Sequence, residues 1–210
     1  MTDAKPTSTP MDYKHQLTAG SPEEHEEVRD LPYQSLMGSL LYVAIATHPD
    51  IAYTVANLCK YNLSYTQSHW IAAKQVLHYV QGTRDLQLTY HHEVGLQMES
   101  MMQISPKVLI GFTDTNWAGD LDTCHSTSRY TFLLGGGAIS WGSKTQTSPA
   151  LSSTEAKYVG ATQATQEAMW LRQMLSDLGI LQTNPTRIWC DNQSTIALSS
   201  NPGSYKHIAV

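Results

Sequence analysis

Three carboxylate residues, Asp114, Glu155 and Asp191, are spaced so that a folded chain can bring them to one point. Asp114 follows the apolar run 108–113 and Asp191 follows the run 187–190, and such short runs are typical of buried strands. Glu155 opens a long helical stretch between them, so the order is strand, helix, strand. Catalytic groups of open α/β sheets gather beyond the carboxyl ends of the strands. The spacing therefore predicts one shared site.

The chemistry of such a site is metal-dependent hydrolysis of a phosphodiester. Hard cations such as Mg²⁺, with Mn²⁺ as an alternative, prefer carboxylate oxygens, and two ions about 4 Å apart steady the attacking and leaving oxygens. Taken singly, Glu155 is explained as a residue of the first turn of a helix, and Asp191 as a helix cap. We predict a metal site because the three residues are judged together.

Composition limits the class of protein. The chain has 210 residues, a net charge of −5 and three cysteines. This length allows one modest α/β domain with an appendage. The negative charge argues mildly against a nucleic-acid partner, although much of it lies in residues 21–30, and carboxylates of a metal site are offset by bound cations. The separated cysteines predict neither a disulfide framework nor a zinc site.

The apolar stretches fall short of the roughly 20 residues that cross a bilayer. The first residues lack the hydrophobic segment of a signal peptide. We therefore expect an intracellular protein of the cytoplasm or nucleus, with no membrane partner and no small-molecule cofactor.

The chain is expected to have three parts. Residues 1–30 contain three prolines, two of them before position 11, and little periodic hydrophobicity, which predicts an extended, poorly ordered leader. Residues 31–85 show helical periodicity, which predicts a small helical connection segment. Its expected helices are 32–46, one around 51–58 with Pro49 in the first turn, and one from the N-cap Ser68 to Gly82.

Residues 86–210 are expected to form the α/β domain. Strands are predicted at 86–90, 108–113, 130–134, 138–141 and 187–190, and helices at 152–178 and 193–199, with a variable loop at 93–106. The triplet Gly135-Gly136-Gly137 predicts a tight hairpin with positive φ. It is not read as a phosphate-binding loop, because a strand and not a helix follows it.

Several segments resemble one known family. The stretches 111–120, 126–128, 134–141, 150–158 and 190–194 are similar to the ribonuclease H domain of copia-type retrotransposon polyproteins. Upstream, the stretches 8–12, 33–42, 49–53 and 69–83 resemble the end of the same family's reverse transcriptase and its connection. The resemblance covers nearly the whole chain, and it is weakest at residues 93–106.

The resemblance implies a ribonuclease H-like mixed sheet with flanking helices, acting as a metal-dependent endonuclease on the RNA strand of an RNA/DNA hybrid. It implies catalytic and metal-binding roles for Asp114, Glu155 and Asp191, with the hybrid and the remainder of a polyprotein as partners. Candidate contacts to the nucleic acid are Ser126, Arg129, Lys144, Lys157, Asn192 and Gln193. A solvated surface explains the three basic residues equally well, and turn capping equally explains the other three.

The departures from the family pattern limit the expected activity. Family members continue past Lys206-His207-Ile208 with an acidic residue, where this chain has Ala209. We therefore expect the fourth ligand and the closing C-terminal element to be missing, with weak Mg²⁺ binding and poor cleavage. The alternative is a non-catalytic module that keeps the fold and binds nucleic acid or protein. A transposase or exonuclease of related fold is a weaker third alternative.

Overall fold

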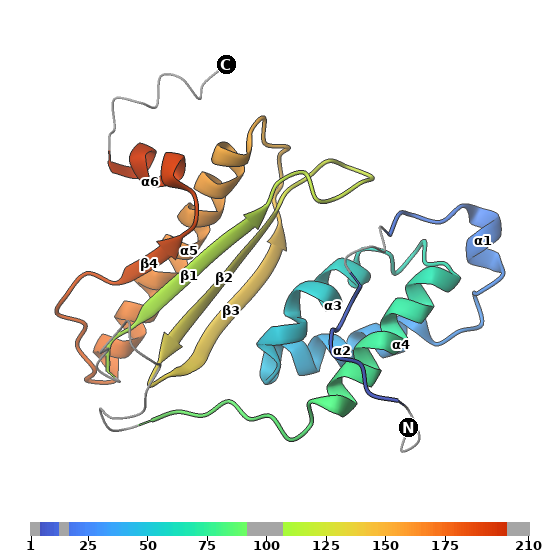
Figure 1. Ribbon diagram of the computed structural model, residues 1–210, viewed down its shortest axis with the longest axis horizontal. Helices are drawn as coiled ribbons and strands as arrows, with labels where there is room; N and C mark the ends of the chain where they lie inside the picture. Colours follow the sequence, from blue (N-terminus) through green and yellow to red (C-terminus); the bar gives the residue numbers. More distant parts are fainter. Residues whose placement is uncertain (1–4, 13–16, 92–106, 201–210) are drawn as a thin grey trace. The chain divides into compact units, whose positions relative to one another are not determined.

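The computed structural model describes residues 5–12, 17–91 and 107–200 (Figure 1). The chain divides after Gln87 into two compact units. We call residues 1–87 the helical unit and residues 88–210 the α/β unit. The predicted loop 93–106 and the C-terminal residues at which the family pattern departs lie outside the described residues.

The helical unit forms around amphipathic helices whose apolar sides meet. Its elements are α1 (Pro22–Glu26), α2 (Tyr33–Ala46), the 3₁₀ helix η1 (Pro49–Ile51), α3 (Ala52–Cys59) and α4 (Gln67–Gly82). Tyr33, Met37, Ile51 and Leu58 are fully buried between them. The three helices predicted from periodicity are confirmed, and Pro49 stands in the first turn of η1, where its fixed φ is favourable.

Helix α4 starts two residues earlier than predicted. Thr66, not Ser68, is the N-cap. The Thr66 backbone N–H donates to His69 Nδ1 at 3.1 Å, and the Thr66 hydroxyl lies 2.9 Å from the same nitrogen. The prediction of Ser68 was wrong because the buried ring of His69 takes the place of the usual glutamate in a capping box.

The leader also differs from the extended segment that we predicted. Ser21 and Glu24 form a capping box, and Pro22 begins the short helix α1. Leu17 and Val28 are buried in the core of the helical unit. Two apolar side chains therefore anchor a segment whose composition is otherwise that of a solvated linker.

The α/β unit is a four-stranded mixed sheet, which confirms the predicted α/β class. The strands are β1 (Ile110–Asn116), β2 (Thr127–Leu134), β3 (Gly137–Thr145) and β4 (Arg187–Cys190), and the helices are α5 (Ser153–Asp177) and α6 (Gln193–Ser200). The sheet order is β3-β2-β1-β4. The pairs β1/β2 and β2/β3 are antiparallel, and β1/β4 is parallel. Helix α5 packs along β1 and β2 (Figure 1).

Close packing of α5 on the sheet sets the geometry of the site. Leu109, Phe132 and Leu171 are almost fully buried between helix and strands. Gly160 allows the close approach, since a Cβ there would lie 2.3 Å from Thr115 Oγ1. The first turns of α5 are consequently held against β1, beside the carboxyl-terminal half of that strand.

The predicted hairpin is confirmed, although its strands are longer than predicted. Gly135 and Gly136 have φ values of 62° and 82°, as a two-residue turn requires. Strand β2 begins at Thr127 and β3 runs to Thr145, in polar stretches that carry no apolar alternation. Strand β1 likewise continues past Asp114, which therefore lies within the strand and not at its end.

The strand predicted at residues 86–90 was wrong. These residues form no regular element; His91 N–H donates to Gly135 O at 2.7 Å, and the Tyr90 hydroxyl donates to Ala138 O at 2.8 Å. Leu86 is 73% exposed, so no apolar surface covers that side of the segment. Alternating residues alone are insufficient for a strand without a buried face.

The helices of the described residues are short or polar. The 25-residue α5 includes charged residues such as Glu167 and Arg172. Among the parts of the chain that the structure describes, none of the helices combines the length and the apolar character needed to cross a membrane.

Candidate functional site

Parallel pairing brings Asp114 and Asp191 together. In the register of β1 and β4, Thr113 lies opposite Cys190. Asp114 and Asp191 are the next residues of these two segments, so the two carboxylates are neighbours where β4 ends beside the carboxyl-terminal half of β1. Asp114 Oδ1 also accepts a hydrogen bond from Thr115 N–H at 2.8 Å. The sequence-predicted pairing of these two acids is therefore present in the fold.

A lysine ammonium lies between the two carboxylates. Lys157 Nζ is 3.5 Å from Asp114 Oδ1 and donates a short hydrogen bond to Asp191 Oδ1. Lys157 comes from the first turns of α5, which the packing on β1 directs toward this end of the sheet. Its side chain is only 16% exposed. The structure thus places a fixed cation where the sequence predicts a metal ion.

Arg129 completes this group of charges. It lies opposite Asp114 in the antiparallel register of β1 and β2, and its Nη2 is 3.3 Å from Asp114 Oδ2. Both carboxylate oxygens of Asp114 therefore face a cation. We call Asp114, Asp191, Arg129 and Lys157 the Asp114 cluster; its two negative and two positive side chains make it formally neutral.

The pKa shifts in the cluster favour the charged forms. Burial lowers the pKa of Lys157, but the hydrogen bond and charge of Asp191, followed by those of Asp114, outweigh it and raise the pKa overall. The hydrogen bond from Lys157 lowers the pKa of Asp191, against a smaller opposing effect of burial. The ion pair between Lys157 and Asp191 is therefore stable across neutral pH.

Glu155 is directed elsewhere. Its backbone N–H donates to Ser152 Oγ at 3.1 Å, and its Oε2 accepts from Leu151 N–H at 2.8 Å. Its side chain lines a hollow of about 180 Å³ together with Lys144 and Gln146. The capping interpretation that the sequence left open for Glu155 thus describes its contacts, and the structure unites two of the three predicted carboxylates.

Within the described part of the chain, the three predicted metal ligands are not gathered into one group. Carboxylate oxygens are suitable donors for Mg²⁺. However, the described residues contain no group of three or more histidine, cysteine, aspartate or glutamate side chains arranged to hold a metal ion. Lys157 stands between two of the acids, and Glu155 bonds to its own helix start.

The polar candidates for nucleic-acid contact divide into two sets. Ser126 is fully buried, and its Oγ accepts from Ala118 N–H at 3.1 Å. Asn192 Oδ1 accepts from Thr195 N–H at 2.8 Å and caps α6. For these two the contacts are those of turn and helix caps. Gln193 and Lys144 are exposed and accessible to a ligand.

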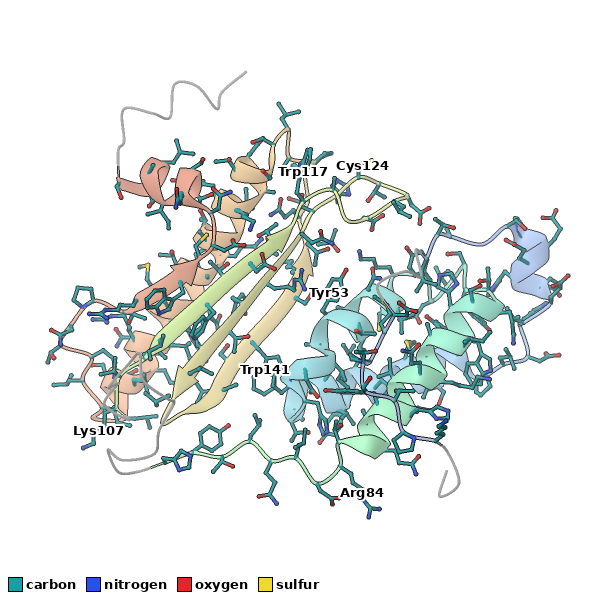
Figure 2. The ribbon with its side chains drawn as sticks, viewed as in Figure 1. Tyr53, Arg84, Lys107, Trp117, Cys124 and Trp141 are labelled. Carbon is teal, nitrogen blue, oxygen red and sulfur yellow. The ribbon has the colours of Figure 1, made fainter. Side chains whose placement is uncertain are left out.

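The loop after β1 is tied to the loop before α5. Trp117 lies at the end of β1 and Cys124 farther along the loop (Figure 2). Trp117 Nε1 donates to Ala150 O at 3.0 Å. Asp120 Oδ1 accepts from the N–H groups of Asp122 and Thr123, both at 3.1 Å. The first bond joins the two loops, and the other two order the loop after β1.

An open cavity of about 470 Å³ adjoins the cluster, and the sequence analysis missed its apolar part. Asp114, Asp191 and Arg129 line it together with Phe112 and Trp189. The two aromatic residues are register partners on β1 and β4 and are 40% and 43% exposed. Each aromatic residue is two positions before an aspartate. This spacing could have predicted that the aromatic residues lie beside the acids, because alternate residues of a strand share a face.

Known proteins align with the whole chain. A retrovirus-related Pol polyprotein from transposon TNT 1-94 of Nicotiana tabacum is 37% identical over 217 residues, covering 100% of this chain and 15% of that protein. A retrovirus-related Pol polyprotein from transposon RE2 of Arabidopsis thaliana is 36% identical over 213 residues, covering 100% of this chain and 14% of that protein. The chain is homologous to copia-type retrotransposon Pol polyproteins. This Pol homologue spans about a seventh of their length.

A shorter relative aligns with part of the Pol homologue. Secreted RxLR effector protein 161 of Plasmopara viticola is 40% identical over 144 residues, which is 69% of this chain and 94% of that protein. No family model matches the chain. No solved structure matches it either. Homology to Pol polyproteins therefore rests on sequence identity.

Proposed function

We propose that this Pol homologue carries a nuclease domain of the ribonuclease H type, which hydrolyses the RNA strand of an RNA/DNA hybrid in retrotransposon replication. One observation carries the proposal: Asp114 and Asp191 meet where β4 ends beside the carboxyl-terminal half of the parallel strand β1, in a chain homologous to Pol polyproteins over its full length. Adjacent acids at the carboxyl ends of strands are typical of catalytic groups in α/β folds.

The proposed cofactor is Mg²⁺, with Mn²⁺ as a substitute, because both prefer carboxylate oxygens. Glu155 is the proposed third ligand. That role requires its side chain to leave the Leu151 N–H and requires Lys157 to leave the two aspartates. Support for the metal comes from the types of the residues and from the family resemblance, and the weak activity expected from the sequence agrees with both requirements.

The basic side chains give the hybrid its proposed contacts. Arg129 and Lys157 are next to the acids, where a scissile phosphate would lie, and exposed Lys144 is opposite Ser128, the neighbour of Arg129, in the register of β2 and β3. A protein recognises a hybrid mainly by backbone shape and 2′-hydroxyl groups, and it needs no base-specific contacts for this. Because these contacts are between basic side chains and phosphates, binding is expected to weaken as the salt concentration rises.

A cleavage assay with end-labelled RNA tests this proposal. The full chain is incubated with Mg²⁺ and an RNA/DNA hybrid, single-stranded RNA or duplex DNA. We expect slow cleavage of RNA in the hybrid alone, reduced at least about tenfold by Asp114→Asn, as is usual when a metal-site partner is changed. Equal cleavage by Asp114→Asn and the unmodified chain would show that the cleavage does not take place at the Asp114 cluster.

A second candidate function is a non-catalytic module that binds nucleic acid or protein. The neutral Asp114 cluster favours it, because Lys157 already satisfies the two acids. The chain also covers 94% of the secreted effector relative, so sequence of this kind occurs outside long polyproteins. Fluorescence anisotropy with a labelled hybrid separates the two: binding without cleavage, unchanged by Asp114→Asn, supports the module.

A further inference from the structure

We propose that Lys157 is the built-in cation of the Asp114 cluster and that it excludes a divalent metal ion from between Asp114 and Asp191. The inference rests on the proposed function only in the choice of ion. It assigns Lys157 a role opposite to that of a phosphate contact: in the free protein the ammonium group holds the site closed to metal.

The first support is the position of the ammonium group. A surface lysine usually extends its charged end into water. Lys157 instead is 16% exposed, while the side chains of Asp114 and Asp191 around it are 53% and 66% exposed. It contacts one oxygen of each aspartate, Oδ1 in both, and an ion that bridges the two aspartates would also need one oxygen from each. The ammonium and a shared metal ion cannot occupy this space together.

The second support is the charge balance. Arg129 faces the other oxygen of Asp114, so the cluster is neutral before any ion arrives. A divalent ion added to the cluster is attracted by the two carboxylates and is repelled by the two positive charges of Arg129 and Lys157. Repulsion between unit charges about 4 Å apart is substantial even near a protein surface. Removing the Lys157 charge leaves two acids facing a single cation.

The third support is the direction of Glu155. Its carboxylate accepts the Leu151 N–H, so it adds no negative charge at the Asp114 cluster. A metal ion that takes the place of the Lys157 ammonium would therefore have only two carboxylate ligands, Asp114 and Asp191. Glu155 and Lys157 are two residues apart in α5, and at this spacing they point to different sides of the helix.

Direct measurement of Mn²⁺ binding by calorimetry, with free Mn²⁺ counted by electron paramagnetic resonance, tests the inference. The full chain is compared with Lys157→Gln and with Lys107→Gln as a matched loss of one charge. Lys107 is exposed and stands before β1, at the other end of that strand from Trp117 (Figure 2). We expect Lys157→Gln to bind Mn²⁺ at least about tenfold more tightly and Lys107→Gln to leave the affinity unchanged.

Two further variants make the result decisive. Lys157→Met keeps the aliphatic stem and should show the same gain as Lys157→Gln. In Asp114→Asn combined with Lys157→Gln the gain should disappear, which assigns the ion to this cluster. Circular dichroism establishes that each variant is folded. An affinity of folded Lys157→Gln and Lys157→Met equal to that of the unmodified chain overturns the inference, as does an equal gain in Lys107→Gln.

Failure of this inference is distinguishable from failure of the proposed function. If Lys157→Gln gains Mn²⁺ affinity and neither it nor the unmodified chain cleaves the hybrid, Lys157 excludes metal and the nuclease proposal is wrong. If the unmodified chain cleaves the hybrid in an Asp114-dependent way and Lys157→Gln gains no Mn²⁺ affinity, the nuclease proposal stands and the exclusion by Lys157 is wrong.

Discussion

The helical unit and the α/β unit hold their polar side chains in different ways. In the helical unit the fully buried Tyr33 hydroxyl donates to the backbone carbonyl of Leu58 at 2.9 Å. In the α/β unit the Asp114 cluster joins side chains to side chains at a half-exposed edge of the sheet. A buried polar group bound to backbone fixes a fold, whereas paired surface charges can exchange partners with a ligand. We therefore expect a ligand to exchange partners with the side chains of the Asp114 cluster.

The largest effect is expected in the core of the helical unit. Tyr33→Ala removes a ring that stacks on Tyr65 at 4.5 Å between centroids, and it should lower the free energy of unfolding by about 3–5 kcal/mol. Tyr33→Phe removes only the hydroxyl and should cost about 0.5–1.5 kcal/mol, because the Leu58 carbonyl loses one donor but keeps the Tyr61 N–H at 3.1 Å. Urea denaturation followed by circular dichroism measures both. Equal losses for the two variants would mean that the ring contributes nothing, contrary to its complete burial.

The next effect concerns the packing that positions Lys157. Gly160→Ala places a Cβ 2.3 Å from Thr115 Oγ1, so α5 must shift from β1 at a cost of about 1–3 kcal/mol. Gly38→Ala is the matched control, since a Cβ there has no neighbour within 4 Å on the exposed side of α2. It should stabilise the helix by up to about 1 kcal/mol. Thermal unfolding of the two variants should therefore shift in opposite directions, and a shared direction would contradict the close approach of α5.

A smaller effect distinguishes capping from ligand contact at the end of β4. Asn192→Ala removes the cap of α6 and should cost about 1 kcal/mol of stability. Gln193→Ala, at the exposed first position of the same helix, should change stability by less than about 0.5 kcal/mol. If hybrid binding falls more for Asn192→Ala than for Gln193→Ala while its stability is unchanged, Asn192 is a nucleic-acid contact and not a cap.

Much of the fold was predictable because its signals are local. Apolar runs ending at Asp114 and Asp191 gave the two strands, and glycines at 135 and 136 gave the turn between β2 and β3. Each depends on residues within one element. The meeting of the two aspartates then follows from parallel pairing at one edge of a sheet.

The site itself was only partly predictable, because side-chain direction depends on how helix and sheet pack. Glu155 and Lys157 are in the same helix start, and the sequence does not say which of them faces β1. Small residues such as Gly160 bring α5 close and turn Lys157, not Glu155, toward Asp114. The cross-strand pairing of Arg129 with Asp114 likewise requires the register of β1 and β2.

The smallest expected effect is the pH dependence of the pair between Lys157 and Asp191. The pKa of Asp191 is lowered in the folded chain, so its contribution to stability is complete above the unfolded value of about 3.9 and is lost as the pH falls through the folded value. The pKa of Lys157 is raised, so its contribution is lost only as the pH rises above about 10.4. Because Asp191 is 66% exposed, the whole contribution should be below about 1 kcal/mol.

Urea denaturation of the unmodified chain and Asp191→Asn, from acid to neutral pH, isolates this contribution. The difference in unfolding free energy should be constant near neutrality and should shrink below about pH 4, where the unmodified aspartate becomes protonated. High salt should reduce the difference at neutral pH, because the pair is at the surface. A difference that grows as the pH falls would mean that Asp191 is destabilised by its neighbours, and Lys157 would then not be its partner in solution.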